Sequence, residues 1–306
     1  MRRYRNHLVD SARWERFPAR PDDVVISTPS KCGTTWMQQL VGMVLLDRIE
    51  FDRPLGTISP WLDMLTVTDE QIFDILEAQT HRRFIKTHAP LDGVPRHDSW
   101  TYITVFRHPL DAALSWRDHF LNLDRERARE LVTRATGEAP APRRGAAAPE
   151  DPTEFLHYWI GNDLDSDGSS LHGLQDYANS LTTSWELRDR PNVHLFHYDD
   201  LWNDLDGQVR RLEELLGVSV DPSHHREIVE AGALDAMRTR SATTSPTTPT
   251  GDGGIFKDPS QFFRQGGRRD WPSMLNPDEV SDARRRLEDL VGAEAAEWAM
   301  RADPST

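Results

Sequence analysis

Four short apolar runs along the chain predict the strands of one parallel β-sheet. They lie at residues 24–27, 84–87, 102–106 and 193–196. Runs of this length that are apolar on both faces are typical of strands covered on both sides by helices. Helical patterns lie between or after them, so we expect an α/β fold with a central parallel sheet flanked by helices.

Apolar residues spaced three and four apart predict the helices. After the first run, these positions are Met37, Leu40, Val41, Val44 and Leu45. Residues 201–216 form one continuous helical pattern that Gly217 ends. Asn276 is a suitable N-cap and Pro277 a suitable first residue for another helix, which we expect to extend to Trp298.

Two segments interrupt this pattern without dividing the chain. Residues 134–152 are rich in Ala, Pro, Arg and Gly, which indicates a mobile insert or lid. Residues 241–260 are rich in Ser, Thr, Pro and Gly, so we expect a loop that is flexible without ligand. Core elements continue on both sides of each segment, so we expect a single domain over residues 1–306.

Composition changes this picture mainly by exclusion. The 36 Lys and Arg against 50 Asp and Glu give a net charge of −14, which disfavours nucleic acid as a partner. The single cysteine, Cys32, excludes an intrachain disulfide. The polar N-terminus and the lack of any run near the ~18 apolar residues of a membrane span predict a cytoplasmic protein without integral membrane association. The oligomeric state stays open.

Residues 27–36 place Ser, Lys, Gly and Thr where the first strand turns into a helix. Unpaired N–H groups and the helix dipole make such a turn a cradle for phosphate or sulfate. Lys31 adds a full positive charge, and Thr34 and Thr35 add hydroxyl donors. Alternatively, this is an ordinary turn with a solvated lysine. It is not a Walker A loop, because Lys31 precedes Gly33, which argues against an ordinary kinase or ATPase.

A second strand-to-helix turn carries Arg107 at the end of the third apolar run. Pro109 suits the first helical turn, and Ser115 lies about two turns further along. Arginine can bind phosphate with two parallel hydrogen bonds, and open α/β sheets bind ligands at this edge. Alternatively, Arg107 pairs with Asp111, and both interpretations stay open.

Two further groups of residues are chemically informative. Lys86 and His88 lie on the same side of a strand, with His88 at its C-terminal end, where a histidine can act as a general base. Residues 262–271 include Arg264 and two glycines, which suits a phosphate-binding loop. The alternatives are a packing histidine and a solvated basic turn. We find no His, Cys or Asp cluster with metal-ligand spacing.

The four motifs, in this order, resemble the cytosolic-type sulfotransferases that use 3′-phosphoadenosine 5′-phosphosulfate (PAPS) and release 3′-phosphoadenosine 5′-phosphate (PAP). The resemblance spans roughly residues 20–272. Segments 59–63, 82–93 and 196–198 look closest to bacterial members described as glycolipid sulfotransferases. The resemblance implies a P-loop-like phosphosulfate loop and transfer of a sulfuryl group to a hydroxyl of a small-molecule or glycolipid acceptor.

The resemblance also implies a role for each matched residue. Lys31 would bond the bridging oxygen of the donor, His88 would be the general base, and Lys86 would lie near the sulfuryl group. No metal is required. The remaining donor-binding positions are the loop residues Ser30, Cys32, Gly33, Thr34 and Thr35, the 3′-phosphate residues Arg107, Ser115, Arg264, Gln265 and Gly266, and the adenine residues Trp36, Tyr198, Leu234 and Met237.

The acceptor pocket should lie beyond His88, and residues 59–65, 119–160 and 241–260 should supply its apolar wall. Its candidates are Trp61, Leu62, Met64, Leu65, Phe120, Phe155, Tyr158 and Trp159. Cys32 stands where the family often has Ser, and its place beside Lys31 at a helix start should favour the thiolate, so that alkylation would block donor binding. Two other functions remain possible: a P-loop kinase or hydrolase, and an inactive nucleotide-binding module.

Overall fold

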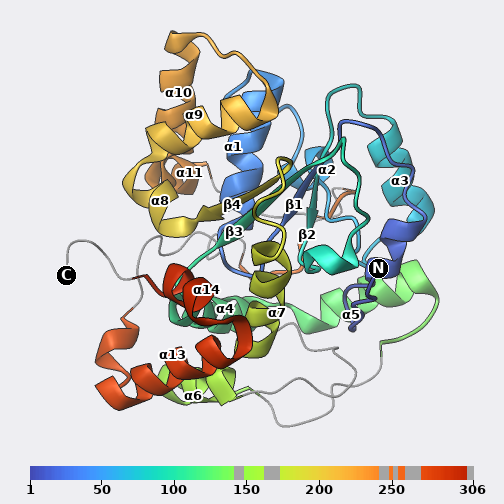
Figure 1. Cartoon of the computed structure of the whole chain (residues 1–306). Coiled ribbons are helices and arrows are strands. Elements are labelled where there is room, and N and C mark those ends of the chain that lie inside the picture. The colour runs from blue at the N-terminus through green and yellow to red at the C-terminus, as the bar shows by residue number, and fades with distance from the viewer. Residues whose placement is uncertain (141–147, 162–172, 241–247, 251–253, 259–269, 302–306) are drawn as a thin grey trace.

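The computed structural model describes residues 1–140, 148–161, 173–240, 248–250, 254–258 and 270–301 (Figure 1). Four strands form one sheet in the order β2-β1-β3-β4, and every neighbouring pair is parallel. The strands are β1 (Val24–Ser27), β2 (Phe84–Thr87), β3 (Thr101–Phe106) and β4 (Val193–His197). The predicted parallel sheet is therefore confirmed, and β3 and β4 are each one residue longer than the apolar runs predicted.

Helices account for most of the remaining described elements. The first half of the chain contains η1 (Ser11–Glu15), α1 (Thr34–Leu46), α2 (Leu55–Ile58), α3 (Asp69–Glu77), η2 (Leu91–Gly93), α4 (Pro109–Asn122) and α5 (Arg125–Thr136). The second half contains α6 (Pro152–Gly161), α7 (Leu174–Trp185), α8 (Tyr198–Asn203), α9 (Leu205–Leu216), α10 (Pro222–Gly232), α11 (Leu234–Thr239), η4 (Trp271–Ser273), α13 (Pro277–Val291) and α14 (Ala293–Ala299). None of the helices in the described ranges is both long and apolar enough to cross a bilayer.

Alternation along the strands builds a core on each face of the sheet. Val24 and Ile26 point to one face, where α1, α9 and α10 cover them. Val25 and Ile85 point to the other face, where they pack with residues of η1 and α3. Because both faces are covered, the strands are buried at nearly every position, which is why short runs rich in apolar residues predicted them.

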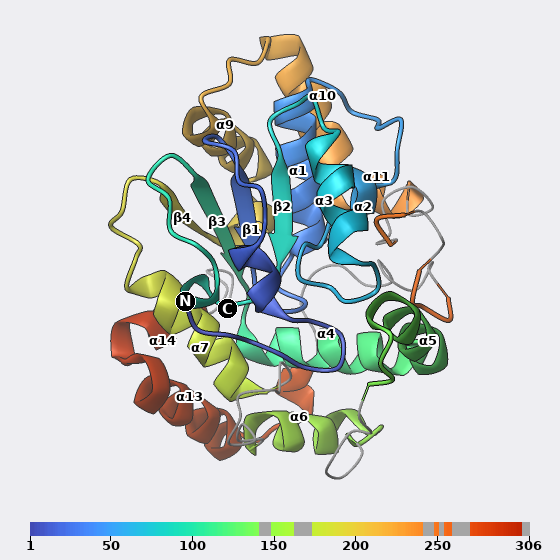
Figure 2. The same cartoon turned by 90° about the vertical axis from the view of Figure 1, so that its right-hand side faces the viewer.

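A third layer of helices lies beyond the C-terminal end of the strands. Helices α4, α6, α7, α13 and α14 gather at this end of the sheet (Figures 1 and 2). They share a core with Phe106, the last residue of β3. Pro109 is the first residue of α4, as predicted. This layer leaves the loops after β1, β2 and β3 between the sheet and α4.

The strand order places a topological switch point between β1 and β3. The chain leaves β1 through α1 and returns to β2 on one side, whereas β3 pairs with the other side of β1. Ligands of open α/β sheets bind outside the carboxyl ends of the strands at such a point. The loop after β1 and Arg107 after β3 flank this position.

A buried ion pair links the starts of β1 and β2, at the N-terminal end of the strands. Arg83 Nε donates to Asp23 Oδ1 at 2.7 Å and its Nη2 to Oδ2 at 2.5 Å, and both side chains are almost fully buried. These residues immediately precede β2 and β1, so the pair supports the register in which Val24 aligns with Phe84. Loss of one partner would leave a buried charge uncompensated, which typically costs about 3–5 kcal/mol.

Two predicted helix boundaries are wrong. The pattern over 201–216 is two helices, because Asp204 has non-helical backbone geometry (φ −142°, ψ 64°) and N-caps α9 by accepting from Gly207 N–H at 3.0 Å. The helix from Pro277 begins as predicted, with Asn276 and Glu279 in a reciprocal capping box. It ends at Gly292, whose φ is 85°, so Trp298 belongs to the separate helix α14. Local capping decided both boundaries where hydrophobic spacing could not.

The two irregular segments are only partly described. Helix α5 runs into the predicted 134–152 insert as far as Thr136, α6 starts at its end with Pro152, and residues 141–147 lie outside the described part. Of the predicted 241–260 loop, residues 248–250 and 254–258 are described. Both segments contribute residues to a cavity at the switch point.

A buried histidine ties the C-terminal helix to the sheet. His197 Nδ1 accepts from Asp199 N–H at 3.2 Å, so Nε2 carries the proton and donates to Ala299 O at 3.3 Å. The ring is fully buried, and Trp298 packs edge-on to it. Burial, reinforced by the charge of Arg301, lowers the pKa of His197 to about 4. The neutral ring is therefore part of the folded structure.

We expect stability to fall with acid through this residue. The pKa of His197 is 6.5 unfolded and about 4 folded, so its contribution is complete above pH 6.5 and is lost as pH falls towards 4. The full shift corresponds to a loss on the order of 3 kcal/mol. Calorimetric melting at pH 7.5 and 5.0 should show the step, and it should be smaller in His197→Asn, which keeps an acceptor for Asp199. An identical step in both proteins would contradict this assignment.

Candidate functional site

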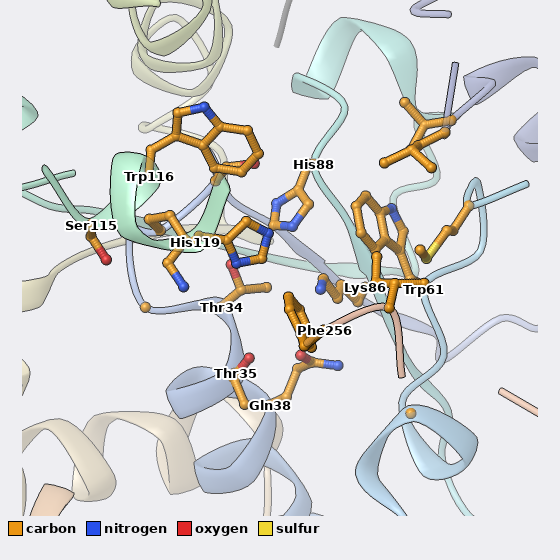
Figure 3. Close-up of a pocket in the computed structure, with 18 of the residues that line it drawn as sticks. Thr34, Thr35, Gln38, Trp61, Lys86, His88, Ser115, Trp116, His119 and Phe256 are labelled. Atoms are coloured by element: carbon orange, nitrogen blue, oxygen red, sulfur yellow. The ribbon is translucent and has the colours of Figure 1, made fainter. Parts of the chain in front are cut away.

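One cavity of about 190 Å³ lies at the switch point and joins two chemically different ends. The polar end is formed by Ser30, Lys31, Gly33, Thr34, Thr35, Trp36, Arg107, Ser115, Tyr198 and Leu234. The apolar end includes Leu8, Val9, Trp61, Met64, Phe120, Leu123, Ile255 and Phe256. Lys86 and His88 also line it, so their side chains face the same space as the loop after β1 (Figure 3).

The loop after β1 reaches α1 through two residues with left-handed backbone geometry. Lys31 has a φ of 67° and Gly33 a φ of 108°. A β-carbon on Gly33 would lie 3.1 Å from Tyr198 Cδ2, so both the backbone and the packing require glycine. Gly33 is the N-cap of α1 and no side chain caps this helix, which leaves N–H groups of its first turn available to an anion. An uncommon conformation at a non-glycine residue such as Lys31 is typical of functional loops.

Hydroxyl groups at this helix start are fixed by the neighbouring strand end. Thr34 Oγ1 is hydrogen-bonded to Thr28 Oγ1, and both Thr34 and Thr35 line the cavity. Trp36 is held more tightly, because its indole N–H donates to Gly232 O at 2.8 Å and its ring packs edge-on to Tyr198 at 5.2 Å. Residues 27–36 therefore present backbone N–H, hydroxyl and ammonium groups together, which suits a phosphate or sulfate.

Arg107 satisfies both interpretations drawn from the sequence. Its Nε lies 3.7 Å from Asp111 Oδ2, and both side chains are buried. It also lines the cavity, where its guanidinium carbon lies 4.5 Å from the ring centre of Tyr198. Tyr177 donates to the backbone oxygen of Arg107 at 2.9 Å and so fixes the turn into α4. A buried cation at one end of the cavity favours an anionic group there.

His88 is held in one tautomer by the backbone. Its Nδ1 lies 2.7 Å from Thr28 O, and because a carbonyl can only accept, Nδ1 carries the proton. Nε2 is therefore the nitrogen that carries the lone pair in the neutral ring. Trp61 packs edge-on to the imidazole at 4.6 Å between ring centres. A neutral histidine with an oriented Nε2 is a suitable general base for a hydroxyl proton.

Lys86 projects from β2 beside the same indole ring. Its Nζ lies 4.3 Å from the ring centre of Trp61, a cation–π contact. Burial lowers the pKa of Lys86 to about 8, and the Asp63 carboxylate partly opposes this shift. Asp63 is itself buried and accepts from Thr87 Oγ1 at 2.6 Å. Lys86 thus places a positive charge on the cavity wall, and it loses its proton more readily than an exposed lysine does.

The other predicted donor residues divide into three groups. Ser115, Tyr198 and Leu234 line the cavity, as does Ser30. Met237 is fully buried in the core on the α1 face and is not among the lining residues. The remaining predicted positions, Arg264, Gln265 and Gly266, lie outside the described residues.

The expectation of a reactive Cys32 thiolate is wrong. The side chain is fully buried in the core formed by Phe106 and helices α4, α6 and α7, and it does not line the cavity. Burial raises the pKa of the thiol to about 12, which outweighs the nearby charges of Arg107 and Lys31. The residue lies within the loop after β1, but next to the left-handed Lys31 its side chain is directed to the core and not to the cavity.

The predicted acceptor wall is also revised. Trp61, Met64 and Phe120 line the cavity. Leu62 and Phe155 are core residues, and Trp159 lines a separate small cavity that reaches His88 and Ser30 from the α7 side. The remaining candidates, Leu65 and Tyr158, are not among the residues that line either cavity.

Sequence reasoning missed several lining residues. His119 lies four residues after Ser115 on α4, so helical spacing carried a usable signal for it. Phe256 lies in the 241–260 loop that was expected to contribute to the wall, whereas the N-terminal residues 6–9 carried no signal, because they reach the cavity only through tertiary packing. Among the described residues, no group of three or more His, Cys, Asp or Glu side chains is arranged to hold a metal ion.

The sequence of this chain is similar to those of known proteins. A family model described as the sulfotransferase domain matches residues 21–294. A glycolipid sulfotransferase of Mycobacterium bovis is 37% identical over 97% of this chain and 93% of its own length. One from Mycobacterium tuberculosis is 36% identical with the same coverage of both chains.

Solved structures share the fold at lower identity. Retinol dehydratase in complex with androsterone and inactive cofactor PAP has a TM-score of 0.66 at 19% identity, covering 98% of this chain and 90% of that chain. A mouse sulfotransferase complexed with PAP has a TM-score of 0.65 at 19% identity, covering 94% and 93%. The two likenesses show that the fold is shared.

We expect Cys32 to be inert in the native protein. Its fully buried thiol, with a pKa of about 12, should not react with an aromatic disulfide reagent at pH 8, whereas the denatured chain should react completely. Absorbance of the released thiolate, with mass spectrometry of the labelled chain, measures both. Stoichiometric labelling of the native protein at the rate of the denatured chain would contradict the buried placement.

Proposed function

This chain belongs to the sulfotransferase family, and from that premise we propose which of its residues act and what kind of hydroxyl compound it accepts. The reaction is transfer of a sulfuryl group from PAPS to a hydroxyl group. Membership of this family favours sulfuryl transfer over the two other functions that the sequence left open, a P-loop kinase or hydrolase and an inactive nucleotide-binding module. The observation that supports the proposal best is the single cavity that joins an anion-binding helix start to an apolar wall across His88.

The polar end of the cavity would hold the donor. The open first turn of α1, with Thr34 and Thr35, suits the 5′-phosphosulfate group. Arg107 and Ser115 would bind the 3′-phosphate, since both line the cavity from the other side of the switch point. The adenine would lie against Trp36, Tyr198 and Leu234.

The chemistry would need one base and two positive charges. The acceptor oxygen forms a bond to sulfur as the bond from sulfur to the donor's bridging oxygen breaks, and the hydroxyl proton passes to Nε2 of His88. Lys31 would stabilise the charge that develops on the bridging oxygen, and Lys86 the charge on the sulfuryl oxygens. As in phosphoryl transfer, positioning and charge stabilisation would supply most of the rate enhancement.

The acceptor would be an amphipathic alcohol, with a glycolipid as the favoured class. The wall beyond His88 is formed by aromatic and aliphatic side chains such as Trp61, Met64 and Phe256. Such a wall suits a hydrocarbon group, while the hydroxyl to be sulfated reaches the imidazole. The two mycobacterial relatives named glycolipid sulfotransferases, at 36–37% identity, support the same class.

Replacing His88 should separate catalysis from donor binding. We expect His88→Ala to lower kcat by about 10²–10⁴-fold, the usual contribution of a general base. The dissociation constant for PAP, measured by calorimetry, should change little, because His88 adjoins the sulfuryl position and not the phosphates. His157→Ala is the matched control, since His157 is a half-exposed histidine on α6 outside the cavity. Full activity in His88→Ala would remove His88 as the base.

Acceptor affinity should grow with hydrocarbon length. In a series of alkyl glucosides from hexyl to decyl, each added methylene that enters the apolar end should lower KM about two- to fourfold, from about 0.8 kcal/mol per buried CH₂. Radiolabelled PAPS measures the transfer. A KM that does not depend on chain length, or a preference for phenols without a chain, would contradict an amphipathic acceptor.

A further inference from the structure

Residues 254–258 form part of the apolar end of the cavity. Ile255 is buried among Met64, Leu123 and residues of α5, and Phe256 packs on the same cluster. The ring of Phe256 meets the His119 ring edge-on, with 5.1 Å between centres. All four of His119, Phe256, Trp116 and Trp61 line the cavity, and in Figure 3 the His119 and Phe256 side chains lie between those of Trp116 and Trp61.

This segment is held by the short connection between α4 and α5. Asp124 N–H donates to Ile255 O and Lys257 N–H donates to Asn122 O, each at 2.8 Å, around an antiparallel bridge between Leu123 and Phe256. The pairing also satisfies a carbonyl at the end of α4 that has no partner within the helix. The backbone of residues 122–124 thus serves as a short strand for the cavity wall.

The Asn122 side chain extends that pairing by one unit. Its Nδ2 donates to Asp258 O at 2.8 Å, and its Oδ1 accepts from Asp258 N–H at 3.0 Å. A carboxamide supplies one donor and one acceptor side by side, as a peptide group does, whereas a carboxylate or a hydroxyl cannot make the same pair. We call the contact of Asn122 and residues 123–124 with residues 255–258 the clasp.

Asn122 is not among the cavity-lining residues, but its helix presents several. Ser115, Trp116, His119 and Phe120 of α4 all line the cavity. His119 stacks on Trp116 at 5.0 Å between ring centres, so the face that meets Phe256 is itself fixed to the helix. Pinning residues 255–258 to the C-terminal end of α4 therefore sets the position of Phe256 against His119.

We propose that Asn122 is a positioning residue for acceptor selection, which acts through the clasp by holding Ile255 and Phe256 in the apolar wall. This inference rests on the proposed function, because it assigns the acceptor to that end of the cavity. The donor end is formed mainly by the loop after β1 and the turn after β3, and α4 contributes Ser115 to it from about two turns before Asn122. The effect of Asn122 should therefore fall on the acceptor and spare the donor.

The first test compares Asn122→Ala with the wild type, using octyl glucoside as acceptor. Loss of two hydrogen bonds of about 1 kcal/mol or less each should raise the acceptor KM about 5- to 20-fold. KM for PAPS should stay within about twofold, since a shift that small is near 0.4 kcal/mol. Asn122→Asp keeps the acceptor for Asp258 N–H and should give an intermediate KM. Asn179→Ala, which removes a carboxamide bonded to Gln175 on α7, is the matched control and should leave both KM values unchanged.

A double-mutant cycle tests whether Asn122 acts through Phe256. Phe256→Ala should raise the acceptor KM at least as much as Asn122→Ala, and the double variant should resemble Phe256→Ala alone. Additive effects, an unchanged acceptor KM, or equal increases in the acceptor and donor KM of Asn122→Ala would each overturn the proposal. Equal increases would indicate a general structural role.

A binding measurement keeps the two proposals distinguishable. Octyl glucoside binding, followed by calorimetry, reports on the apolar wall without turnover. Sulfate transfer to the glucoside by the wild type tests the proposed acceptor class. If the wild type binds the glucoside but does not sulfate it, the acceptor class fails, and the clasp is still decided by whether Asn122→Ala weakens binding at least about fivefold.

Discussion

Parallel pairing of β1 with both β2 and β3 is the constraint on which the site depends. Because all four strands are parallel, the turns after β1, β2 and β3 lie at the same end of the sheet. The chain continues from β1 to β2 on one side, whereas β3 pairs on the other side, which leaves room between the turns after β1 and β3. That single geometry brings Lys31, His88 and Arg107 to one cavity from positions far apart in sequence. The buried Arg83–Asp23 pair at the N-terminal end of the strands supports the register that aligns these turns.

Local electrostatics at this edge oppose the charge of the whole chain. The protein carries a net charge of −14, yet Lys31, Lys86 and Arg107 line one cavity beside the N-terminus of α1. Burial strengthens the charges of Lys86 and Arg107 towards an anionic ligand and also makes a charge costly to hold, as the lowered pKa of Lys86 shows. Concentrating positive charge where the backbone already offers N–H groups is therefore sufficient to hold an anionic donor in an acidic protein.

Residue patterns predicted some features because their causes are local. Strands covered on both faces are rich in apolar residues, so the sheet was predictable. A Lys-x-Gly-Thr-Thr turn before a helical pattern indicates an anion-binding helix start, so the character of the loop after β1 was predictable too. Asp204 and Gly292 ended helices by capping and backbone geometry that hydrophobic spacing does not record. Cys32 was misjudged because one left-handed residue before it decides which way its side chain points.

The sequence by itself determined the α/β class, the positions of the four strands along the chain and a helix start suited to an anion, since each follows from contiguous residues. Only the tertiary structure decided the acceptor end. Its wall is formed by the N-terminal residues 6–9, the loop carrying Trp61, the end of α4 and Phe256, which no local pattern relates to one another. Pocket walls arise from long-range packing between side chains, and a contact such as Asn122 to Asp258 exists only after the chain has folded.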